Sequence, residues 1–75
     1  MDQELFNLEL RKFLKRFGVT AQREIEQAVG AALARRDITG REALPVRATL
    51  TIPGVLPELV VEGEIALEGP EPETG

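Results

Sequence analysis

The chain has 75 residues, with 9 Lys and Arg against 13 Asp and Glu, and it contains no His, Cys, Trp or Tyr. This length accommodates a single domain, and the formal net charge of -4 is concentrated in residues 46–75, which hold 6 acidic residues and 1 basic residue. The missing residue types exclude catalysis by imidazole, thiolate or phenol groups, disulfides, and metal sites built from His or Cys.

The first predicted element is an amphipathic helix over residues 2–17. Its apolar residues recur at intervals of three and four, which places them along one side of a helix. Acidic residues come early in this segment and basic residues late, as the helix macrodipole favours. We expect Gly18 to end the helix in the left-handed conformation. The apolar side comprises Phe6, Leu10, Phe13, Leu14 and Phe17.

A second helix is predicted from Thr20 to about Arg36. The Thr20 hydroxyl can cap its first turn. Alanine makes up half of its apolar face, so the partner helix can approach closely. Residues 37–44 form a connector containing Gly40, and the apolar face comprises Ala21, Ile25, Ala28, Val29, Ala32 and Leu33.

Alternation of apolar and polar residues predicts an antiparallel hairpin after residue 45. One strand covers residues 46–52, and a second run covers residues 59–67. Pro53-Gly54 has the order that a type II turn prefers. The expected register pairs Ile52 with Leu59, Ala48 with Gly63, and Arg47 with Glu64.

The predicted fold is therefore α+β, with two N-terminal helices packed on one face of a C-terminal antiparallel β-hairpin, in the order ααββ. Residues 1–68 form one domain, and residues 69–75 form a disordered acidic tail. A two-stranded ribbon has two open edges, so pairing with a second copy in a homodimer is one expectation. The alternative is a monomer whose edges are protected by twist, by short strands and by glutamates.

Four basic residues form the candidate binding cluster. They lie beside the expected start of the second helix, where free amides and positive charge suit an anion or an acidic partner. The alternative is a solvent-exposed helix face that complements the macrodipole. The cluster comprises Arg11, Lys12, Lys15 and Arg16.

A helix, a Gly-Val-Thr turn and a second helix also suggest a divergent helix-turn-helix that binds nucleic acid. Glu24 stands where such modules usually have an apolar residue, and the acids of the second helix would repel phosphates. Nucleic acid is therefore a disfavoured partner.

Catalytic and metal sites are not expected. The acidic residues fall at exposed positions, the strand glutamates do not form a calcium loop, and no glycine loop for phosphate is present. We expect no enzyme activity, no cofactor and no metal. No apolar run approaches the roughly 20 residues that span a bilayer, so we expect a cytoplasmic protein without a membrane partner.

Several segments resemble a family of short, functionally uncharacterised bacterial proteins, a domain of unknown function. The resemblance covers residues 5–68, and its most distinctive part is the Gly18-Val-Thr turn followed by Gln22-Arg-Glu-Ile-Glu. It implies a bacterial origin and a small free-standing protein, and it assigns no functional residue. The further matching segments are Arg11-Lys-Phe-Leu-Lys, Leu44-Pro with Thr49-Leu-Thr, and Val60-Val-Glu-Gly-Glu-Ile with Leu67-Glu.

Together these patterns predict a small non-catalytic protein that acts by binding. The sequence favours a protein–protein interaction module that associates with itself through the hairpin edge and with an unknown protein through the basic cluster. The nucleic-acid-binding helix-turn-helix is the alternative hypothesis.

Overall fold

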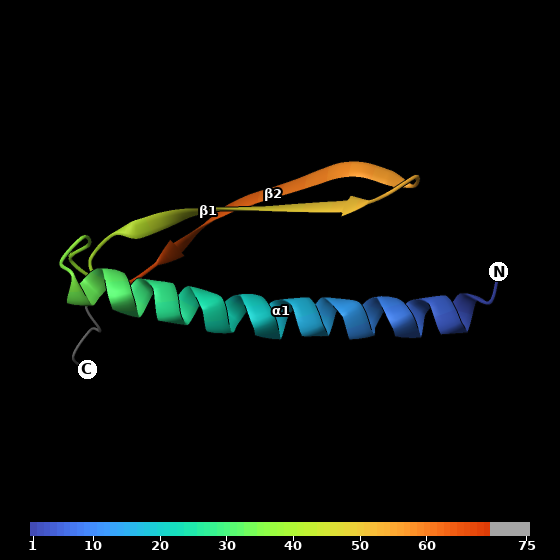
Figure 1. The fold of residues 1–75 in the computed structure, drawn as a ribbon, viewed down its shortest axis with the longest axis horizontal. Coiled ribbons are helices and arrows are strands. Elements are labelled where there is room, and N and C mark those ends of the chain that lie inside the picture. Colours follow the sequence, from blue (N-terminus) through green and yellow to red (C-terminus); the bar gives the residue numbers. More distant parts are fainter. Residues whose placement is uncertain (70–75) are drawn as a thin grey trace, which may run out of the picture. The chain divides into compact units, whose positions relative to one another are not determined.

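The structure, a computed structural model, describes residues 1–69 and contains one helix followed by two strands (Figure 1). The helix α1 spans Gln3–Ala34, and the strands β1 and β2 span Ala43–Ile52 and Leu56–Ala66. The protein is therefore α+β, but the prediction of two N-terminal helices is wrong. The chain divides into a helical unit, Met1–Asp37, and a hairpin unit that starts at Ile38.

Helix α1 begins at Gln3, one residue after the predicted start, and Asp2 is its N-cap. Asp2 has extended backbone angles, and its carboxylate accepts a hydrogen bond of 3.0 Å from the backbone N–H of Leu5. This bond satisfies one of the N–H groups that have no partner within the first turn. Glu4 adds a favourable negative charge at the positive end of the helix dipole.

The helix runs through Gly18 and Thr20, which were expected to separate two helices. The physical reason is an apolar stripe whose spacing does not change at this point. Its members follow one another at intervals of four, four and three residues, so they repeat every eleven residues and stay on one side of a single helix. Gly18 costs about 1 kcal/mol relative to alanine in a helix interior, whereas a break would leave two sets of unpaired backbone groups. The apolar stripe comprises Phe6, Leu10, Leu14, Phe17, Ala21, Ile25, Ala28 and Ala32.

The end of α1 is a Schellman motif with Arg36 in the left-handed position. The N–H of Asp37 donates to the carbonyl of Ala32 at 2.9 Å, and the N–H of Arg36 donates to that of Leu33 at 3.1 Å. Arg36 has a φ of 63°, a conformation usually taken by glycine. The Arg35 side chain also donates to the Asp37 carboxylate at 2.9 Å. The helix therefore ends two residues before the predicted end.

Strands β1 and β2 form the predicted antiparallel hairpin, but in a different register. Val46 lies opposite Gly63 and Ala48 opposite Val61, so the two small residues do not face each other. Arg47 lies opposite Glu62 rather than Glu64. The expected register is thus wrong by two residues, a shift that leaves every side chain on its predicted face.

A tight turn and a bulge explain this difference. The N–H of Val55 donates to the carbonyl of Ile52 at 3.0 Å, and Gly54 between them has a φ of 80°, which agrees with the predicted Pro-Gly turn. Because the turn is short, β2 starts at Leu56, opposite Ile52. The register shifts between Leu50 and Ile52, so Pro57 and Glu58 both lie opposite Thr51. This bulge places Leu56 on the apolar face of the hairpin.

No side chain in the described part of the chain is fully buried. The apolar face of the hairpin is half-buried at its most covered positions and open at others, such as Val61 at 57%. The proposed packing of helical residues on this face and the single domain over residues 1–68 stay predictions. Most of the predicted disordered tail, residues 70–75, lies outside the described residues.

Candidate functional site

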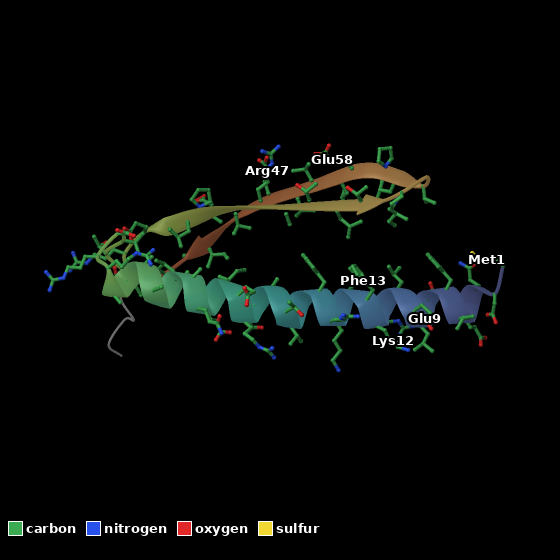
Figure 2. All side chains as sticks on the ribbon, in the orientation of Figure 1. Met1, Glu9, Lys12, Phe13, Arg47 and Glu58 are labelled. Carbon is green, nitrogen blue, oxygen red and sulfur yellow. The ribbon has the colours of Figure 1, made fainter. Side chains whose placement is uncertain are left out.

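The four predicted basic residues lie in the middle of α1 rather than beside a helix start. The backbone N–H groups near them are used within the continuous helix, so the amides invoked for an anion site are not free. What remains at these four residues is an exposed basic surface on the helix. Lys12 Nζ lies 3.8 Å from the Glu9 carboxylate, one turn earlier (Figure 2). With Phe13 and Arg16 this pair lines a shallow depression on the helix.

The apolar stripe is a second exposed surface of the helical unit, in addition to the basic cluster. Within it, Phe6, Leu10 and Phe17 are 47%, 42% and 46% exposed. Phe13 lies beside the stripe, and its ring stacks on that of Phe17 with the centroids 6.5 Å apart. A single helix cannot cover its own apolar side, so the stripe needs another element against it.

The hairpin has one apolar and one polar face. On the polar face, Arg47 Nε lies 3.8 Å from the Glu62 carboxylate across the two strands. Both side chains are about two thirds exposed, at 69% and 70%, so this ion pair contributes little to stability. Figure 2 shows Arg47 on β1 and Glu58 farther along the hairpin. The apolar face comprises Leu44, Val46, Ala48, Leu50, Ile52, Leu56, Leu59, Val61, Gly63 and Ile65.

The connector contains a carboxylate site that sequence reasoning missed. Glu42 accepts hydrogen bonds from the backbone N–H groups of Thr39 at 2.8 Å, Gly40 at 2.9 Å and Arg41 at 3.1 Å. Backbone hydrogen bonds to its carboxylate, first that from Thr39, then that from Glu42 itself and a smaller one from Gly40, lower the pKa of Glu42 to about 2. The sequence feature that could have revealed this site is a glutamate shortly after Thr-Gly, in a loop whose backbone N–H groups had no other predicted partner. The site fixes the connector just before β1 and occupies three consecutive backbone N–H groups there.

Among residues 1–69, no group of three or more acidic side chains is placed to hold a metal ion. Although α1 has 32 residues, neither it nor any other helix in the described range is apolar enough to cross a membrane.

The chain belongs to a family of unknown function, DUF6494, whose model matches residues 1–68. This match confirms the family resemblance seen in the sequence, and it covers the helix, the connector and both strands. No curated protein and no solved structure matches the chain.

Proposed function

We propose that this member of the family is a non-catalytic protein–protein interaction module that associates with a second copy of itself. The hairpin edge joins the copies, and the apolar stripe of α1 supplies further contact area. The basic cluster of Arg11, Lys12, Lys15 and Arg16 is then free to bind a second protein of acidic character. We also propose that the protein is cytoplasmic and of bacterial origin.

The observation that supports the proposal is the exposure of large apolar side chains along α1. Ten of them, from Leu5 to Leu33, are 37% to 53% exposed. Burying such a side chain fully stabilises a protein by about 1.5–3 kcal/mol. A chain of this size has a marginal balance between burial and lost entropy, so covering this surface contributes a decisive share of its stability.

The distribution of side-chain size along the apolar stripe favours a second copy as the partner. Its first half has four large members, and three of the four members in its second half are alanine. If two copies of α1 pair antiparallel, Phe6 lies opposite Ala32, Leu10 opposite Ala28, and Phe17 opposite Ala21. Large side chains then meet small ones, which is how facing helices interdigitate.

Charge at the ends of α1 agrees with this orientation. Asp2 and Glu4 lie at one end of the helix, and Arg35 and Arg36 follow the other. Antiparallel pairing brings the acids of one copy near the bases of the other. It also aligns the two helix dipoles favourably.

The alternative function, a divergent helix-turn-helix, requires a turn between Gly18 and Thr20. Helix α1 is continuous there, so no observation favours this mode of nucleic-acid binding.

Sedimentation equilibrium over a wide range of protein concentration tests the proposal. We expect a reversible species of twice the 8.2 kDa chain mass. Leu10→Ala should shift the equilibrium to monomer, because truncating a leucine that becomes buried costs about 2–5 kcal/mol. Lys12→Ala, with an exposed side chain on the same helix, is the matched control and should behave as the wild type. A wild-type chain that stays monomeric at the highest concentration contradicts the proposal.

A further inference from the structure

We infer that two copies join through the outer edge of β1, in antiparallel orientation, with Thr49 opposite Thr49 of the partner subunit. The product is a four-stranded sheet in which both β1 strands are central and both β2 strands are at the edges. This inference rests on the proposed self-association and assigns its strand and register.

The hydrogen-bond pattern shows which backbone groups are available. The N–H of Leu67 donates to the carbonyl of Glu42 at 2.9 Å, so these two residues form a hydrogen-bonded pair just beyond the ends of the strands. Such pairs alternate with non-hydrogen-bonded pairs along an antiparallel ladder. Arg47, Thr49 and Thr51 therefore direct their backbone groups away from β2, toward the open edge of β1. On β2, the corresponding residues are Val60, Glu62, Glu64 and Ala66.

The edge of β2 is poorly suited to pairing with itself. Its bulge at Pro57 and Glu58 interrupts the regular backbone and lacks one N–H group. Symmetric antiparallel pairing centred on Glu62 or Gly63 places Glu62 opposite Glu62 or Glu64 of the partner subunit, and pairing centred on Val61, the middle of β2, places Glu64 opposite Glu58 of the partner subunit. Like charges placed directly opposite destabilise a sheet, and charged residues are a common protection of strand edges.

The edge of β1 has neither the bulge nor the acidic residues of β2. Pro45 and Pro53, which lack N–H groups, stand at equal distances on either side of Thr49. With Thr49 at the symmetry axis, each proline lies opposite the other proline, just outside the paired segment. Arg47 then lies opposite Thr51 of the partner subunit. Thr49 lies opposite Thr49 of the partner subunit, and a Thr–Thr cross-strand pair is favourable.

This arrangement also extends the apolar face. A twofold axis perpendicular to the sheet keeps the same face of both hairpins on one side. The apolar residues of β1, such as Ala48 and Leu50, then continue into those of the second copy. Isolated two-stranded ribbons are marginal in water, whereas three or more strands with an apolar face can be stable.

Cysteine cross-linking tests the assigned edge, because the native chain has no cysteine. Thr49 and Val60 lie opposite each other in the hairpin, each with its backbone groups at an outer edge. The single variants Thr49→Cys and Val60→Cys are therefore a matched comparison. A hydrogen-bonded antiparallel pair has a Cα separation of about 5.5 Å, within the range that a disulfide spans. We expect Thr49→Cys to form a disulfide-linked dimer at least about tenfold faster under mild oxidation, since pairing raises the local thiol concentration. Equal rates, or faster linkage of Val60→Cys, overturn the inference.

A second pair of variants avoids covalent chemistry. Thr49→Lys places two positive charges opposite each other at the proposed axis and should weaken dimerisation about fivefold or more, whereas Val60→Lys should leave it nearly unchanged. A larger effect of Val60→Lys assigns the interface to β2 and contradicts the inference, while the proposed function stands. Sedimentation of the wild-type chain as a monomer removes the proposed function as well, so the two failures are distinguishable.

Discussion

Arg36 adopts a left-handed backbone conformation, with a φ of 63°, at the position that closes α1. A residue with a Cβ atom pays roughly 1–2 kcal/mol in this conformation, and glycine does not. We therefore expect Arg36→Gly to stabilise the protein by about 1 kcal/mol, after allowance for the greater freedom of glycine in the unfolded chain.

Thermal unfolding followed by circular dichroism at fixed protein concentration measures this change. Arg35→Gly is the control, because Arg35 has an ordinary helical φ of -81° and donates to Asp37. The Arg35→Gly variant should therefore be less stable than the wild-type protein. A loss of stability in Arg36→Gly as well would contradict the Schellman geometry.

Glu42 gives a prediction about pH. Backbone hydrogen bonds to its carboxylate, above all that from Thr39, favour the ionised form and lower its pKa to about 2. Because the folded pKa lies below the unfolded value, the connector is fully stabilised above about pH 4.5 and loses this contribution as the pH falls toward about 2. A carboxyl-carbon NMR titration should show a midpoint near 2 for Glu42. A midpoint at the ordinary value of 4.5 would mean that the connector bonds do not form in solution.

At the scale of the element, the continuity of α1 is the feature most open to test. Gly18→Ala should stabilise the helix by about 1 kcal/mol if Gly18 lies in its interior. The structure has room for the added methyl group, since apart from its chain neighbours and the surrounding helix backbone no atom lies within 4 Å of its position. If Gly18 instead ended a helix in the left-handed conformation, the same change would destabilise the protein. Thermal unfolding distinguishes the two outcomes.

The elements also show what sequence reasoning could and could not predict. The strands were predictable because alternation of apolar and polar residues over seven or more positions depends only on neighbouring residues. The turn was predictable because Pro53-Gly54 is a sequence that a type II turn prefers. Gly18 and Thr20 were misread because each suits a helix end as well as it tolerates a helix interior. The choice depends on whether the apolar phase continues, a property of the whole segment. The hairpin register was wrong because the bulge at Pro57 and Glu58 has no distinct sequence signature.

Part of the candidate site could likewise be predicted from the sequence, and part of it depends on the fold. Charge alone located the basic cluster on a helix, and its supposed free amides depended on the misplaced break after Gly18. The Glu42 site was missed because it depends on the path of the connector, which brings three consecutive N–H groups around one carboxylate.

For the whole molecule, self-association would cover both the apolar stripe of α1 and an open edge of the hairpin. If a second copy covers these surfaces, folding and association are one equilibrium, and stability depends on protein concentration. Thermal unfolding of the wild-type chain at two concentrations that differ by about a hundredfold tests this most directly. We expect the midpoint to rise with concentration, by roughly 5–10 °C. Identical midpoints, with full helical signal at the lower concentration, would contradict it.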